Sequence, residues 1–131
     1  MKTVLHHAAT QGVSQSYNEA LELAQGEYVL RAEDDDFCRP DLIAKLVSVL
    51  DGHPSLGLAY TAGRLVDAEG RFLRYSWDVP DERRRNLLER GWIRSGHSVL
   101  REMFAEGNCI HGFSTMFRRE CYLRVGPYET R

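Results

Sequence analysis

The sequence predicts an α/β domain built on a mainly parallel sheet, because short apolar segments alternate with segments of helical periodicity. Residues 28–32 are apolar or aromatic except for Arg31, which is typical of a short buried strand, and residues 56–62 form a second such segment. Between them, Pro40 opens a segment whose apolar residues recur on one helical face. Strands that alternate with helices usually pair in parallel through right-handed crossovers, so we expect a parallel sheet.

Shorter segments complete the predicted domain. Val4 and Leu5 indicate a first strand, and Ser16 with Glu19 forms a capping-box pattern at the start of a helix. Residues 64–73 are typical of two short strands around an acidic glycine turn, which predicts a β-hairpin. The C-terminal half is expected to contain one or two short helices in residues 81–106, a last strand in 109–117 and a helical turn in 118–125.

Length and composition limit the function classes. A chain of 131 residues is one domain at most, so we expect residues 1–131 to form a single domain. A net charge of −2 gives no general attraction to nucleic acid, and no apolar run is long enough to span a membrane. Three scattered cysteines do not make a disulfide framework, and no signal-peptide pattern is present. We therefore expect a cytoplasmic protein.

Four consecutive acids, Glu33-Asp34-Asp35-Asp36, directly follow the predicted strand at 28–32. In water, each pair of adjacent carboxylates repels by about 1 kcal/mol, so the run favours either full solvation or a shared cation. Hard divalent ions such as Mg²⁺ and Mn²⁺ prefer carboxylate oxygens, and open α/β sheets bind ligands at the carboxyl ends of their strands. A solvated acidic turn is the alternative, but the position after a buried strand favours a cation site.

Other short motifs lie before and after the acid cluster along the chain. They are a glycine turn leading into a helix with Asn18 (12–18), an Ala-Gln-Gly-Glu-Tyr step (24–28), a Val-Asp-Ala-Glu-Gly hairpin (66–70), a basic strand end (117–119) and a Gly-Pro-Tyr-Glu turn (126–129). This ordered set, spanning nearly the whole chain, resembles family 2 glycosyltransferases.

The resemblance implies a three-layer α/β/α sandwich of the nucleotide-diphospho-sugar transferase type. It also implies transfer of a sugar from a nucleotide-diphospho-sugar donor to an acceptor hydroxyl, with inversion and with Mn²⁺ or Mg²⁺ as cofactor. In the acid motif, Asp35 would bind the metal, Glu33 would contact metal or ribose, and Asp36 would support the site. Asn18 would contact the donor, although a local hydrogen bond or helix cap is an equal alternative. His111 could face a saccharide or other hydroxyl acceptor, although a packed or solvated histidine is the commoner case.

The chain departs from the family pattern in several ways. Glu33 stands where aspartate is usual, and Tyr17 stands where arginine is common, which removes one expected contact to the donor phosphates. The resemblance further implies that two strand–helix units precede Met1 and that the catalytic base lies beyond Arg131. We therefore expect an incomplete domain that is inactive in isolation.

Two further function classes remain open. One is a non-catalytic binding or interaction module derived from the same fold, and the other is a metal-dependent phosphohydrolase or nucleotidyltransferase. The second would require a nucleophilic aspartate or a Gly/Lys phosphate loop, and neither pattern is found. A missing first strand would also leave Tyr28 to Ala32 with an unpaired edge, so we expect a homodimer that pairs or swaps edge elements.

Overall fold

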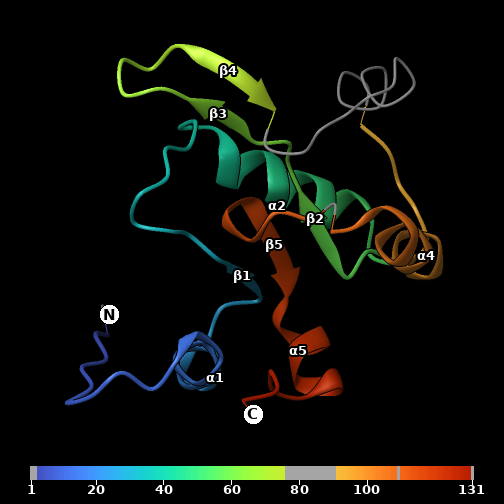
Figure 1. Cartoon of the computed structure of the whole chain (residues 1–131). Coiled ribbons are helices and arrows are strands. Elements are labelled where there is room, and N and C mark those ends of the chain that lie inside the picture. The colour runs from blue at the N-terminus through green and yellow to red at the C-terminus, as the bar shows by residue number, and fades with distance from the viewer. Residues whose placement is uncertain (1–2, 76–90, 109, 131) are drawn as a thin grey trace.

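The computed structural model describes residues 3–75, 91–108 and 110–130 (Figure 1). No helix in this part of the chain is both long and apolar enough to cross a membrane. The elements in chain order are α1 (Val13–Leu23), β1 (Tyr28–Leu30), α2 (Leu42–Gly52), β2 (Leu58–Tyr60), β3 (Arg64–Val66), β4 (Phe72–Tyr75), α4 (Gly96–Glu106), the 3₁₀ turn η1 (Gly112–Ser114), β5 (Thr115–Arg118) and α5 (Arg119–Val125).

The mixed α/β class is confirmed, but the prediction of a mainly parallel sheet is wrong. The three-stranded sheet has the order β1-β5-β2, and β5 pairs antiparallel with both of its neighbours. Tyr28 lies opposite Arg118, and Leu58 lies opposite Phe117. Since β1 and β2 both oppose β5, they run in the same direction, as the strand–helix–strand pattern predicts.

The physical reason is strand order. Periodicity identifies β1, α2 and β2 as consecutive elements, but it does not exclude a later strand from the gap between β1 and β2. Here β5, from the C-terminal part of the chain, occupies that gap and supplies all the ladder hydrogen bonds of the three-stranded sheet. The three-layer arrangement stays a prediction.

The core lies where α2 packs against the sheet. Leu46, Leu50 and Met116 form its buried cluster, with Leu50 at 0% exposure, and Tyr28, Leu30, Leu42, Val47, Leu56 and Ala59 pack around it. The leucines are four residues apart, so they lie on one face of α2, as the helical pattern predicts.

The C-terminal end of α2 is tied to the sheet by Arg118. Its guanidinium donates through Nη2 to the carbonyl of Leu50 (2.7 Å) and through Nε to that of Leu56 (2.9 Å). The Leu50 carbonyl also accepts from the N–H of His53, which caps the helix, so Arg118 adds a second bond there and links it to the Leu56 carbonyl beyond α2. Arg118 thus fixes the register of α2 against β5.

The predicted hairpin is confirmed as β3 and β4, which form a separate two-stranded sheet (Figure 1). In its turn, the Asp67 carboxylate accepts hydrogen bonds from the backbone N–H groups of Arg71 (2.8 Å) and Glu69 (3.1 Å). These bonds, led by that from Arg71, lower the pKa of Asp67. Gly70 has a φ of 80°, a conformation that favours glycine. The acid and the glycine of the motif therefore both serve the turn.

Two N-terminal predictions are wrong. Val4 and Leu5 form no strand, and both side chains are exposed, because two apolar residues offer too little surface to hold a strand in place. Helix α1 begins at Val13 rather than at Ser16, and the Ser16 hydroxyl donates to the carbonyl of Gly12 (3.1 Å) instead of capping.

The predicted C-terminal elements are observed within the described residues. Helix α4 confirms the later part of the helical prediction, and α5 confirms the helical turn. The last strand is confirmed as β5, but it begins at Thr115, because residues 112–114 form the turn η1 instead of strand. The earlier part of the helical prediction, residues 81–90, and the predicted strand start at position 109 lie outside the described residues. Whether residues 1–131 form a single domain stays a prediction.

Candidate functional site: an acidic turn beside a held glutamate

The acid turn Glu33–Asp36 lies where the sequence predicts, between the end of β1 and the start of α2. Figure 1 shows that the chain extends away from the sheet after β1 and then returns to it as α2. Asp34, Asp35 and Asp36 are exposed, whereas Glu33 is half-buried. Among the described residues, none forms a hydrogen bond or an ion pair with these three aspartates. Their carboxylates are therefore available to a ligand.

Glu33 is in a different situation, because Arg31 binds its carboxylate. Nε and Nη2 of Arg31 lie 2.6 and 2.5 Å from the same oxygen, Oε1 of Glu33. The two side chains are 40% and 32% exposed, so the pair is only partly screened by water. The first acid of the motif thus already has a cation beside it.

Tyr17 of α1 completes this arrangement. Its hydroxyl donates to Oε1 of Glu33 (3.3 Å), and the guanidinium carbon of Arg31 lies 4.5 Å from the centre of its ring. Burial raises the pKa of Tyr17, so the hydroxyl remains protonated and able to donate at neutral pH. We refer to these three residues as the Tyr17–Arg31–Glu33 cluster.

A third segment, the turn η1 before β5, packs against the cluster at Gly112. A β-carbon at Gly112 would lie 2.8 Å from Nη1 of Arg31 and 2.9 Å from its guanidinium carbon. A side chain at position 112 would therefore push the guanidinium from its present place beside the turn. The backbone N–H of Arg31 also donates to the carbonyl of Thr115 (3.3 Å), which fixes η1 beside the strand end.

His111 directly precedes this glycine. Its ring stacks on that of Phe113, with centroids 5.3 Å apart and an angle of 27° between the planes. Burial lowers the pKa of His111, so the imidazole is neutral at pH 7. His111 therefore adjoins Gly112, which packs against Arg31 of the cluster. Contact of His111 with an acceptor stays a prediction.

Asn18 makes a long-range contact that sequence reasoning missed. Its Nδ2 donates to the carbonyl of Tyr128 (2.9 Å), and its Oδ1 accepts from the N–H of the same residue (2.8 Å). The side chain is 8% exposed. Asn18 thus ties α1 to the C-terminal Gly-Pro-Tyr-Glu turn, rather than capping its own helix. Contact with the donor stays a prediction, and it would have to share these amide atoms.

Three members of the site were not predicted as site residues: Tyr17, Arg31 and Gly112. The sequence does contain a signal for Arg31, which is the one charged residue in an otherwise apolar strand segment. In an extended chain, residues two apart lie on the same side, so Arg31 and Glu33 are placed to pair. No local pattern indicates that Tyr17 or Gly112 joins them.

The residues of the turn are compatible with a divalent cation held together with a substrate. Within the described part of the chain, no group of three or more His, Cys, Asp or Glu side chains is arranged to hold a metal by itself. Mg²⁺ usually takes only one or two protein carboxylates and completes its shell with substrate phosphates and water. Asp35 and Asp36, exposed and adjacent, fit that requirement.

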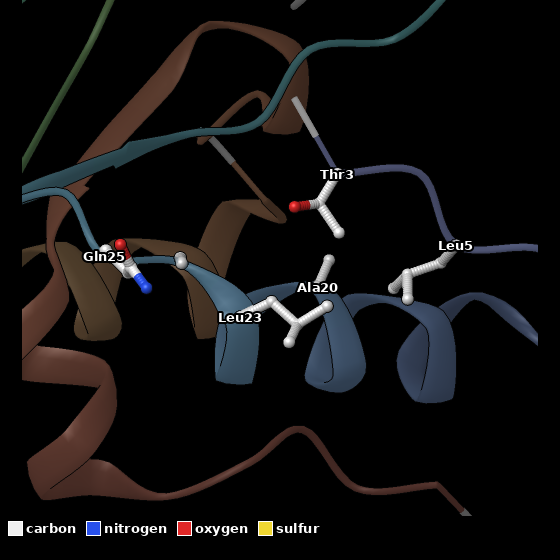
Figure 2. A pocket seen from close by; sticks show the side chains of 6 residues that line it. Thr3, Leu5, Ala20, Leu23 and Gln25 are labelled. Carbon is white, nitrogen blue, oxygen red and sulfur yellow. The ribbon is translucent and has the colours of Figure 1, made fainter. Parts of the chain in front are cut away.

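A pocket of about 370 Å³ lies elsewhere, between the N-terminal segment and the C-terminal half of α1 (Figure 2). Figure 2 shows Leu5 close to Ala20 and Leu23 there. The pocket is lined by Thr3, Leu5, Ala20, Leu23, Ala24 and Gln25, none of which belongs to the acid turn or the cluster. It does not contribute to the candidate site.

The sequence is similar to known proteins in two ways. Over 58 residues, or 44% of this chain, it is 36% identical to "Uncharacterized protein y4gI" of Sinorhizobium fredii (strain NBRC 101917 / NGR234), and the match covers 6% of that protein. The model of the family described as "Glycosyl transferase family 2" matches residues 2–125. That match covers the acid turn, the cluster and every element of the described fold. The chain belongs to glycosyl transferase family 2.

Proposed function

We propose that this chain supplies the metal- and diphosphate-binding part of the donor site of a glycosyltransferase. The reaction would move a sugar from a nucleotide-diphospho-sugar to an acceptor hydroxyl, with inversion. Family membership supports the reaction class. The observation that carries the assignment of the site is the exposed, unpaired state of Asp34, Asp35 and Asp36 directly after a strand end.

In this proposal, Asp35 holds Mn²⁺ or Mg²⁺, and Asp36 supports the site. When bound, the cation would neutralise the charge that develops on the departing nucleoside diphosphate. The chain's own contribution is to hold one or two carboxylates at a fixed edge of the sheet, where donor phosphates complete the coordination shell. His111, neutral and next to the turn that packs on Arg31, would lie toward the acceptor.

Calorimetry with uridine and guanosine diphosphates, each with and without Mn²⁺, tests this assignment. We expect one of the two nucleotides to bind with Mn²⁺ and to lose at least about tenfold in affinity when EDTA removes the ion, because the metal bridges protein and phosphate. Nucleotide binding with the same affinity in the presence and absence of Mn²⁺, or no binding of either nucleotide, would contradict the proposal. Release of phosphate without an acceptor would favour a phosphohydrolase instead.

We also propose that the chain forms a homodimer through the free edge of β1. In the described sheet, β1 is an edge strand that pairs with β5 on one side only. The N–H of Arg31 donates to Thr115, the first residue of β5, and the carbonyl of Glu27 accepts from Arg119, just after β5. Because bonded and non-bonded pairs alternate along an antiparallel ladder, the backbone groups of Tyr28 and Leu30 point away from β5. A second copy could satisfy these groups once, across a two-fold axis.

Light scattering measures the assembly directly. We expect a particle of about twice the 15.0 kDa chain mass. Leu30→Pro should favour the monomer, because it removes an N–H that the partner strand would use. Circular dichroism checks that this variant folds, since Leu30 also packs against the core. A well-dispersed monomer in the wild type would contradict the dimer.

A further inference from the structure

The geometry points to Glu33 as a structural carboxylate that Arg31 and Tyr17 hold and that does not coordinate the cation. Arg31 is thereby a positioning residue, and it lowers the affinity of the acid turn for divalent ions. This inference rests on the proposed function of the same turn. It also reassigns Glu33, which the sequence pattern predicts to contact the metal.

One oxygen of Glu33 receives three donors. Oε1 of Glu33 receives Nε and Nη2 of Arg31 and the hydroxyl of Tyr17, at 2.6, 2.5 and 3.3 Å. A carboxylate oxygen has two lone pairs in the plane of the group, and three donors occupy both. A metal ion at Oε1 would have to displace charge-assisted hydrogen bonds, which are the stronger kind. A metal ion at Oε2 would meet a carboxylate whose charge the adjacent guanidinium already balances.

Two other segments pack around the side chain of Arg31. Its guanidinium lies over the Tyr17 ring on one side and against Gly112 on another, where a β-carbon would already be only 2.8 Å from Nη1. Its backbone N–H is bonded to Thr115. The Tyr17 ring and the turn at Gly112 thus flank the guanidinium beside Glu33, through contacts that involve no ligand.

The four acids of the turn differ in their surroundings. Glu33 is half-buried and paired, whereas Asp34, Asp35 and Asp36 are exposed, and no described residue pairs with them. A guanidinium beside the first acid also reduces the negative charge that the turn presents to a cation. Arg31 thus weakens the attraction of Mn²⁺ for the free turn and leaves donor phosphates to complete the site.

The test is a double-mutant cycle read by electron paramagnetic resonance of free Mn²⁺, with nucleotide present and absent. Arg31→Met should raise the Mn²⁺ affinity by about tenfold, because it removes a positive charge and releases a carboxylate. Glu33→Gln should lower it by about threefold or less, since only a nearby charge is lost. The double variant, which keeps the net charge of the wild type, should bind within about threefold of the wild type.

Two results would overturn the inference. One is a double variant that binds Mn²⁺ at least about tenfold more weakly than the wild type, as expected if Glu33 were a ligand. The other is an Arg31→Met variant that binds no more tightly than the wild type. Circular dichroism checks that each variant folds, and Arg31→Gln replaces Arg31→Met if the latter does not.

Failure of the proposed function has a different signature. It would appear as wild-type protein that binds neither Mn²⁺ nor nucleotide, with Asp35→Asn indistinguishable from it. The comparison of Arg31→Met with the double variant then decides the inference: a gain of Mn²⁺ binding that disappears in the double variant supports it, and the absence of any gain in Arg31→Met overturns it.

Discussion

Asp35→Asn is expected to abolish the Mn²⁺-dependent binding of nucleoside diphosphate. Loss of even an outer partner of a metal ligand costs about 10- to 100-fold in affinity, so loss of a direct carboxylate ligand should cost about 100-fold or more. The substitution keeps the shape of the side chain and removes only its charge. Because Asp35 is exposed and contacts no described partner, stability should not change. Calorimetry with Mn²⁺ and the nucleotide that binds the wild type gives the measurement.

Asp34→Asn is the matched control. It removes the same charge one residue away, from an equally exposed side chain with no assigned role. We expect a loss of about threefold or less, which is the general electrostatic effect of one charge near the ion. Equal losses in the two variants would mean that the turn attracts cations only through its net charge. Equal affinity in the wild type and Asp35→Asn would rule out Asp35 as a ligand.

Leu50→Ala is expected to produce the largest loss of stability. Leu50 has 0% exposure and packs with Leu46 and Met116 between α2 and the sheet. Truncating a buried leucine to alanine lowers the free energy of unfolding by about 2–5 kcal/mol, because apolar contacts are lost and a cavity remains. Since whole domains are stable by only about 5–15 kcal/mol, a loss of this size removes a large part of the free energy that keeps the protein folded.

Urea unfolding followed by circular dichroism measures this effect, and Val49→Ala is its control. Val49 is the neighbouring residue on α2 and is 42% exposed, so its truncation should cost about 0.5 kcal/mol or less. Similar losses in the two variants would show that α2 does not pack on the sheet through the Leu46–Leu50 face.

The local sequence pattern predicts the position of the candidate site but not the different surroundings of its four acids. The acid turn lies between a strand and a helix, as predicted, because an apolar run followed by Pro40 and a 3.6-residue pattern depends only on neighbouring residues. The same pattern does not reveal that Glu33 differs from the three aspartates. That difference arises from Tyr17 and Gly112, which reach Arg31 and Glu33 only when α1 and η1 pack beside the end of β1.

By itself, the sequence determined the type and order of most elements, the hairpin turn and the position of the acid turn. Each of these depends on residues within a few positions of one another, so propensity and periodicity suffice. Only the tertiary structure decided that β5 enters between β1 and β2, that Asn18 binds the backbone of Tyr128, and that Arg31 holds Glu33. Strand order and the Asn18–Tyr128 contact join residues far apart in the chain, and residues far apart in the chain also hold the Arg31–Glu33 pair in place. The free energy of forming these contacts therefore depends on the packing of the whole chain and not on any local pattern.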